Sequence, residues 1–262
     1  MIRVAVCGAC GRMGRLIIKQ ISNQSDMKLV AAIDVAGTPD EGKDAGELAS
    51  VGRLEVKIVG VDKLAEVLKR SKPDVLVDFT NATAAIQNMK TAADAGISVV
   101  VGTTGFTKEE LTEIEKIIKN KKIRAVISPN MSVGVNVFFK SIEEMAKIIG
   151  DGYDVEIVEV HHIGKKDAPS GTAKKAAQII AKALGKSEDS VRIRSIRQGD
   201  VVGDHTVIFS GPQEKIEIAH HAHSRETFAA GVIKAIRHVV KKGKPGVVHD
   251  MQDVLNFSHR TF

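Results

Sequence analysis

The chain has 262 residues, 43% hydrophobic and 27% charged, and its formal net charge of +6 corresponds to a pI near 9.2. No apolar run is long enough to span a bilayer, and the basic residues are mixed with acidic ones in a chain that is only 3% aromatic, which argues against a nucleic-acid-binding surface. We therefore expect a globular protein of the cytoplasm with no membrane or nucleic-acid partner. Its length favours two domains, because single cores rarely grow past the usual domain size.

Short β-branched segments alternate with helical patterns through the first half of the chain. Strands are expected at residues 2–8, 29–34, 74–80, 98–105 and 124–130, with helices at 12–24, 82–95 and 107–121. Strands that are apolar on both faces and separated by helices predict a Rossmann-type doubly wound α/β domain with a parallel sheet. Thr107 and Glu110 form a capping-box pattern, so the "GTTG" before them is expected to be a loop at the carboxyl end of a strand, where such sheets bind ligands.

The pattern changes after a helix expected at 134–149. Four segments alternate apolar and polar residues, at 154–162, 190–197, 205–211 and 215–223, and helices are expected at 171–184 and 225–242. Such strands predict a second, α+β domain whose open mixed sheet has an uncovered face, and self-association would cover that face. We place the dinucleotide-binding domain at 1–130, completed by 240–262, and the substrate-binding and oligomerisation domain at 131–239.

The loop "VAVCGACGRMGR" after the first strand permits two interpretations. Cys7 and Cys10 form a C-x-x-C pair, whereas Gly8, Gly11 and Gly14 are typical of a turn that brings backbone N–H groups to a pyrophosphate. The glycine spacing departs from the usual G-x-G-x-x-G, because Cys10 occupies the place of the second glycine.

Two observations favour the glycine interpretation. Asp34 ends the second expected strand, where a carboxylate can accept hydrogen bonds from an adenosine ribose. A redox role needs an exposed, acidic thiol, and a metal site needs two further ligands, whereas Cys7 is expected in a buried strand and no other cysteine exists. Both cysteines are therefore interpreted as small space-filling residues.

The densest polar cluster is "EVHHIGKKDAPSGTAKKA" at 159–176. His161 and His162 end a strand, Lys165 and Lys166 follow on a loop, and a helix begins near Gly171 with N–H groups that can bind an anion. Each piece taken singly is also typical of ordinary structure, but their concentration in one loop favours a site for a carboxylate substrate that gains a proton. The run "HHAHSR" at 220–225 could line a site or an interface, and no cysteine or carboxylate joins it at metal-ligand spacing.

Seven segments together resemble one known family. "GACGRMG", "DFTNATA", "VGTTGF", "SPNMSVGVNVF", "EVHHIGKKDAPSGTA", "GDHTVIF" and "HHAHSRETFAAG" occur in the order found in 4-hydroxy-tetrahydrodipicolinate (dihydrodipicolinate) reductases of lysine and diaminopimelate biosynthesis. The resemblance spans nearly the whole chain, and the segment with the paired histidines is the most specific.

The resemblance implies NAD(P)H-dependent reduction of a small cyclic dicarboxylate by a homotetramer joined through the second domain. It implies an acid/base role for His161 and a proton-donor role for Lys165, with His162, Lys165, Gly171 and Thr172 binding the substrate carboxylates. It implies that NADH or NADPH is held by Gly8, Ala9, Cys10, Gly11, Arg12, Met13, Asp34, Gly102, Thr103, Thr104, Ser128, Pro129, Asn130 and Met131. No metal is implied.

Two positions depart from the family pattern. Many members carry a basic residue after the acidic one, able to meet a 2′-phosphate, but Val35 follows Asp34 here, so a preference for NADPH is not expected. His238 occupies a late-helix position where many members have tryptophan, a change expected to affect packing only.

Two other functions compete with this interpretation. A nicotinamide-sensing regulator would also use a Rossmann domain, but it needs a recognition helix and a positive face. An amino-acid dehydrogenase such as aspartate dehydrogenase would share the first domain but lack the loop "HHIGKKDAPSGTA".

Overall fold

A computed structural model describes residues 1–257 of the chain. The chain divides into two compact units. The first contains Met1–Met131 and the chain from Phe228 on, and the second is the continuous segment Ser132–Thr227. Each unit has its own hydrophobic core. Helix α8 (Glu226–Lys241) thus lies almost entirely with the first unit, whereas the sequence-based boundary assigned it to the second.

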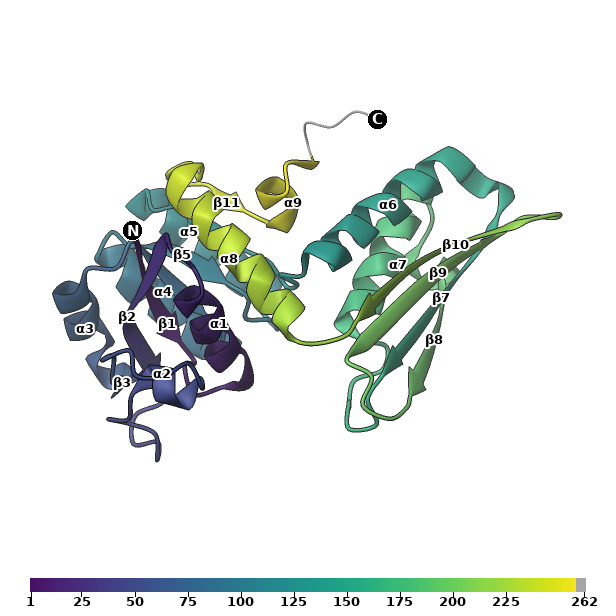
Figure 1. Cartoon of the computed structure of the whole chain (residues 1–262). Coiled ribbons are helices and arrows are strands. Elements are labelled where there is room, and N and C mark those ends of the chain that lie inside the picture. The colour runs from purple at the N-terminus through teal and green to yellow at the C-terminus, as the bar shows by residue number, and fades with distance from the viewer. Residues whose placement is uncertain (258–262) are drawn as a thin grey trace. The chain divides into compact units, whose positions relative to one another are not determined.

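A seven-stranded parallel sheet forms the centre of the first unit (Figure 1). Its strand order is β11-β6-β5-β4-β1-β2-β3, and the neighbouring strands β1 and β4 are parallel. The strands are β1 (Ile2–Cys7), β2 (Met27–Asp34), β3 (Ile58–Gly60), β4 (Val75–Asp78), β5 (Ser98–Val101), β6 (Ala125–Ile127) and β11 (Val248–His249). This order confirms the predicted doubly wound fold, and it places the crevice at the carboxyl ends of β1 and β4.

The sheet is apolar on both faces because helices pack against both. Core residues of β1 alternate between two clusters, one containing α1 and α8 and the other containing α3, α4 and α5. The remaining helices of this unit are α1 (Arg12–Ser22), α2 (Ala45–Leu48), α3 (Leu64–Ser71), α4 (Ala82–Asp94), α5 (Lys108–Lys121) and α9 (Met251–Val254). The capping box predicted at Thr107 and Glu110 is present and starts α5.

The second unit is a four-stranded mixed sheet with two helices on one face (Figure 1). Its order is β10-β9-β7-β8, in which β7 and β8 are parallel and the other pairs antiparallel. The elements are α6 (Val133–Ile149), β7 (Asp154–His161), α7 (Gly171–Leu184), β8 (Arg192–Arg197), β9 (Gly203–Ser210) and β10 (Lys215–Ala222). Burial alternates along β8, β9 and β10, which confirms the predicted sheet with one packed and one open face.

The sequence patterns located the long elements and missed the short ones. β3, α2 and short 3₁₀ turns at Val61–Lys63, Gly150–Gly152 and Glu188–Ser190 were not anticipated. Within residues 246–255, which were expected to return to the first domain, β11 pairs in parallel with β6 of the first unit.

Candidate active site

In the first unit, the glycine loop between β1 and α1 is shaped by contacts that exclude side chains. Gly8 has a φ of +77°, and a Cβ there would lie 2.5 Å from the carbonyl oxygen of Phe79. A Cβ on Gly14 would lie only 2.0 Å from the carbonyl oxygen of Gly8, whereas one on Gly11 would lie 3.2 Å from the same oxygen. Gly8 sets the turn and Gly14 allows the helix to approach it closely.

The Asp34 carboxylate holds this loop from the neighbouring strand. Its Oδ2 accepts a hydrogen bond from the N–H of Cys10 at 2.7 Å, and its Oδ1 accepts one from the N–H of Val35 at 2.8 Å. No side chain in the described part of the chain caps the start of α1 at Gly11, so the first helical N–H groups can meet an anion. These features fit the pyrophosphate and ribose of a dinucleotide.

The cysteines of the loop do not have reactive thiols. Burial raises the pKa of Cys10 to about 12, with the Asp34 carboxylate adding to the shift. Burial also raises the pKa of Cys7, whose side chain lies in the core. Because the thiolate is the reactive form, these environments support a space-filling role.

Asp78, at the end of β4, organises the next part of this sheet edge. Its buried carboxylate accepts hydrogen bonds from the hydroxyls of Thr80 at 2.7 Å and Thr103 at 2.9 Å, and from the amide of Asn88 at 2.8 Å. The Thr103 hydroxyl therefore connects the loop after β5 to the end of β4. This hydrogen bond to Asp78 is a structural role, separate from the role toward a cofactor that the resemblance implies. Gly102 lies against the ring of Phe79, which leaves no space for a Cβ.

The remaining predicted cofactor residues lie at the same edge of the sheet. Thr104 is exposed beyond β5, and Ser128 follows β6, where its hydroxyl donates to the carbonyl oxygen of Asn130 at 3.0 Å. Pro129 is exposed, and Met131 is buried in the first core. Arg12 and Met13 begin α1, and Ala9 is buried. The carboxyl ends of β1, β2, β5 and β6 thus carry every cofactor residue that the resemblance implied.

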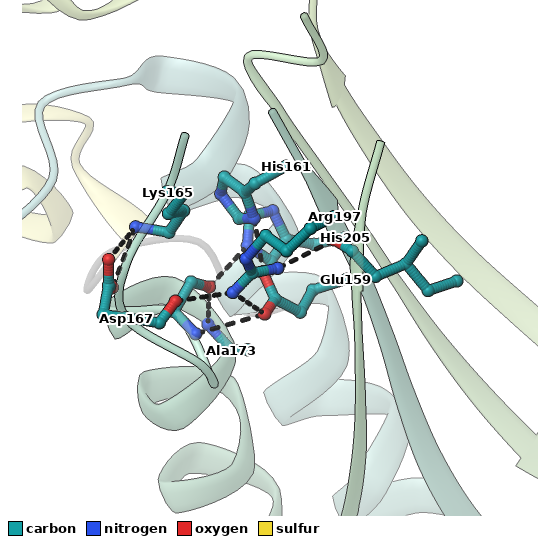
Figure 2. Close-up of polar contacts among 9 residues, drawn as sticks. Glu159, His161, Lys165, Asp167, Ala173, Arg197 and His205 are labelled. Atoms are coloured by element: carbon teal, nitrogen blue, oxygen red, sulfur yellow. Dashed lines mark hydrogen bonds and ion pairs between the residues drawn. The ribbon is translucent and has the colours of Figure 1, made fainter. Parts of the chain in front are cut away.

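In the second unit, His161 ends β7 on the helix-covered face of the sheet. Its Nδ1 is in close contact with Oε2 of Glu159, two residues earlier on the same strand (Figure 2). Burial lowers the pKa of His161, and the Glu159 carboxylate opposes this shift. The positive charges of Lys165 and Arg197 lower the pKa of His161 further.

The Glu159 carboxylate joins three elements. Oε1 accepts hydrogen bonds from the Arg197 guanidinium at 2.9 Å and from the N–H of Ser170 at 3.3 Å. Arg197 ends β8, directly beside His161 in the parallel register, and also donates to the carbonyl oxygen of Asp167 at 2.5 Å. Ser170 caps α7 by accepting the N–H of Ala173 at 3.2 Å.

His205 on β9 lies against this cluster. Its ring meets that of His161 edge-on with centroids 5.1 Å apart, and its Nε2 is 3.1 Å from the Ser170 hydroxyl. Burial lowers the pKa of His205 to about 4, and His161 adds to that shift. His205 is therefore neutral at physiological pH.

The two adjacent lysines differ in their surroundings. The Lys165 ammonium is partly buried and lies 2.7 Å and 2.8 Å from the two carboxylate oxygens of Asp167 (Figure 2). Lys166 is exposed. His162 is half-buried, and its carbonyl oxygen accepts the N–H of Lys165 at 3.0 Å. Gly171 and Thr172 are the first residues of α7.

One set of side chains has ligand atoms spaced as a metal site would require. The atoms offered by Glu159, His161 and His205 lie within 4.8 Å of one another. The Arg197 guanidinium already binds Glu159, and the Lys165 ammonium is nearby, so a metal cation would be repelled. The arrangement is better suited to orienting an imidazole.

Comparison with known proteins decides the family. Residues 2–131 match the dihydrodipicolinate reductase N-terminus, and residues 134–255 match its C-terminus. The chain belongs to the dihydrodipicolinate reductase family.

Relatives in this family match over essentially their full length. The chain is 50% identical to 4-hydroxy-tetrahydrodipicolinate reductase of Methanocaldococcus jannaschii, with 100% of both chains covered, and 48% identical to the protein of that name from Methanothermobacter thermautotrophicus, with 98% and 100% covered. Among solved structures, a dipicolinate-bound dihydrodipicolinate reductase from Paenisporosarcina superposes with a TM-score of 0.80 at 28% identity, covering 97% of this chain and 98% of that one. An amine dehydrogenase from Mycobacterium smegmatis shares the fold, with a TM-score of 0.63 at 15% identity over 94% of each chain.

Sequence reasoning named residues of these loops without the side chains that contact them. Asp78, Glu159 and His205 stood only within quoted motifs, Arg197 stood only within an expected strand, and none of the four was given a role. For Glu159 a signal existed, because residues two apart on a strand share a face with His161. For Arg197 and His205 the signal depends on the pairing of β7 with β8 and β9, which the local pattern does not define.

Proposed function

We propose that the chain catalyses the NAD(P)H-dependent reduction of 4-hydroxy-tetrahydrodipicolinate to tetrahydrodipicolinate in lysine and diaminopimelate biosynthesis, a reaction that takes up a hydride and a proton and releases the hydroxyl group as water. The observation that carries this proposal is the cluster of His161, Lys165 and the start of α7, built in a member of the dihydrodipicolinate reductase family. The full-length relatives that are 4-hydroxy-tetrahydrodipicolinate reductases, and the dipicolinate bound to a similar protein, support it.

The first unit would hold the cofactor. The glycine loop and the start of α1 would bind the pyrophosphate, Asp34 would accept the hydroxyls of the adenosine ribose, and the loops after β5 and β6 would bind the nicotinamide side. The bound nicotinamide supplies the hydride, and the protein orients it.

The second unit would hold the dicarboxylate. Lys165 would attract a carboxylate and donate a proton, while His162, Gly171 and Thr172 would bind carboxylate oxygens at the start of α7. His161 would exchange a proton at Nε2, since its Nδ1 faces Glu159. In this role Lys165 leaves Asp167, so Asp167 holds the lysine in place before the substrate arrives.

NADH is expected to serve at least as well as NADPH. The Asp34 carboxylate repels a 2′-phosphate, and the exposed Val35 beside it has no charge to offset that repulsion. Two cations of this unit, Arg15 and Lys43, contact the carboxylate of Asp40, at 3.4 Å and 2.8 Å. A Michaelis constant for NADPH far below that for NADH would contradict this preference.

The assembly is proposed to be a homotetramer joined through the open face of the second unit's sheet, in the cytoplasm. Alternate residues of β8 and β10 are exposed on that face, and self-association through it would bury them. The described residues include no helix long and apolar enough to cross a membrane. Sedimentation analysis tests the assembly, and a monomer at micromolar concentration would refute it.

The deciding experiment follows the oxidation of NADH with freshly generated 4-hydroxy-tetrahydrodipicolinate. Parallel reactions contain oxaloacetate with ammonia, the reverse substrates of an aspartate dehydrogenase. Oxidation only with the cyclic dicarboxylate supports the proposal. Oxidation only with oxaloacetate and ammonia would replace it with the amino-acid dehydrogenase, and activity with neither would also contradict it.

A further inference from the structure

The Glu159 carboxylate is the most buried charge beside the candidate active site. Its side chain is 0% exposed, and burial of a carboxylate is costly unless hydrogen bonds or opposite charges compensate. In this structure the compensation is divided between its two oxygens. This division determines which nitrogen of His161 faces the carboxylate.

Oε1 receives two fixed donors, and the Ser195 hydroxyl also acts on this carboxylate. The Arg197 guanidinium and the N–H of Ser170 both point to this atom, at 2.9 Å and 3.3 Å. Neither group can act as an acceptor, so Oε1 must remain an unprotonated acceptor. Oε2 is left facing the imidazole of His161.

The orientation of His161 follows from this division. Oε2 and Nδ1 are in contact and neither atom has another hydrogen-bond partner among the described residues, so the anionic acceptor favours the tautomer with the hydrogen on Nδ1 and the lone pair on Nε2. A Cβ on Gly203 would lie 3.0 Å from Nε2, so the glycine at the start of β9 leaves room beside this nitrogen. The proton that His161 exchanges is therefore assigned to Nε2.

The charges around the imidazole come from four elements. Glu159 on β7 favours the imidazolium, whereas Lys165 on the loop and Arg197 on β8 disfavour it. His205 on β9 is neutral and adds no charge. Glu159 is the single anion of this set. Loss of its charge should therefore move the protonation of His161 to lower pH.

We propose that Glu159 is a positioning residue that fixes His161 with its hydrogen on Nδ1 and favours the protonated imidazole, so that His161 exchanges its proton at Nε2. This inference rests on the proposed reduction and assigns to it a residue that does not contact the substrate. The same carboxylate, through Ser170 and Arg197, links His161 to the start of α7 and to the loop that carries Lys165 and Asp167 (Figure 2).

The test uses Glu159→Gln. The amide oxygen of glutamine can keep the bonds from Arg197 and Ser170, but its NH2 group then faces Nδ1 and forces the hydrogen of the neutral imidazole to Nε2. We expect kcat to fall by about 10²-fold, and the alkaline limb of the kcat profile to move to lower pH by about one unit. The Michaelis constant for NADH should stay within about two-fold, because no predicted cofactor residue contacts Glu159.

Glu144→Gln is the control. Glu144 lies in the same unit on α6, away from the open face of the sheet, and pairs with Lys140 at 2.7 Å and Lys147 at 3.1 Å, without a histidine partner. It should leave kcat and its pH profile unchanged. A fall in kcat for Glu159→Gln without any movement of the pH limb would mean that the role is structural only, and would overturn the proposal.

A spectroscopic measurement does not depend on activity or on the variant folding. In the wild-type protein with nitrogen-labelled histidine, the His161 signals, assigned with His161→Asn, should report Nδ1–H in the neutral form. The Nε2–H form in the wild type would overturn the proposal. Wild-type protein that oxidises no NADH but shows Nδ1–H would refute the proposed function while supporting the pairing of Glu159 with His161.

Discussion

Replacing Gly14 by alanine tests whether the glycine loop depends on close approach of α1 to the turn. The added methyl would lie 2.0 Å from the carbonyl oxygen of Gly8 and 2.8 Å from the Cα of Ala9, and both contacts are with backbone that cannot rotate away. The practical minimum for a Cβ contact is near 3.0 Å, so the start of α1 must retreat by at least about 1 Å.

The retreat has two costs. Overpacking a well-fitted contact lowers the free energy of unfolding by about 1–3 kcal/mol. It also moves the first N–H groups of α1 away from the position that binds pyrophosphate, and a misplacement of about 1 Å can weaken such a positioned interaction by about 10²-fold. We therefore expect the Kd for NADH to rise by at least about ten-fold.

Fluorescence titration with NADH and urea denaturation measure the two effects. Gly152→Ala is the control, because a Cβ there meets no atom within 4 Å and the residue lies outside the proposed cofactor site. Unchanged NADH affinity and stability for Gly14→Ala would show that the loop can relax at little cost, and the reasoning from the close contact would be refuted.

Three further changes test other parts of the site. Lys165→Ala should lower kcat and raise the substrate Michaelis constant, each by about 10²-fold, with NADH binding unchanged, while the exposed Lys166→Ala should change steady-state kinetics less than about two-fold. Cys10→Ala should keep turnover within a few-fold, and the wild-type thiol should react slowly with a disulfide reagent at neutral pH, because its pKa is about 12. Asp78→Asn should lower the free energy of unfolding by about 2–4 kcal/mol in urea denaturation, because the amide would turn an NH2 toward donors that the carboxylate now accepts.

Each of these predictions has a result that would contradict it. Equal damage from the two lysine variants would mean that the loop acts as a diffuse positive patch. A redox role for the loop would be supported if mild oxidation abolished wild-type activity, a reductant restored it, and the activity of Cys10→Ala did not respond to oxidation. Wild-type stability for Asp78→Asn would show that the hydrogen bonds at the end of β4 can rearrange freely.

The first unit was largely predictable because its signals are local. Apolar runs bounded by glycine identify buried parallel strands, and the capping box at Thr107 fixes the start of α5. β3 has only three residues, too short for a periodic signal, and its place depends on pairing with β2. Asp78 was missed for the same reason, since its partners Asn88 and Thr103 converge only in the folded sheet.

In the second unit, the histidine and lysine loop was recognisable by its composition, but its supports come from strands distant in the sequence. Arg197 and His205 lie beside His161 and Glu159 because of the β8-β7-β9 order. A mixed sheet leaves that order open to sequence analysis, because parallel and antiparallel pairings accept the same alternating pattern.

The second unit is an uninterrupted stretch of sequence, whereas the first is made from two stretches separated by it. During synthesis, Ser132–Thr227 leaves the ribosome complete before α8 and β11 are available to the first unit. Until α8 has been synthesised, residues 1–131 therefore expose the core face that α8 later covers. The edge of β6 stays unpaired until Val248 and His249 have been synthesised. Truncation before α8 should consequently yield an aggregating chain, and the nascent protein should be most dependent on chaperones in the interval before its last thirty or so residues emerge.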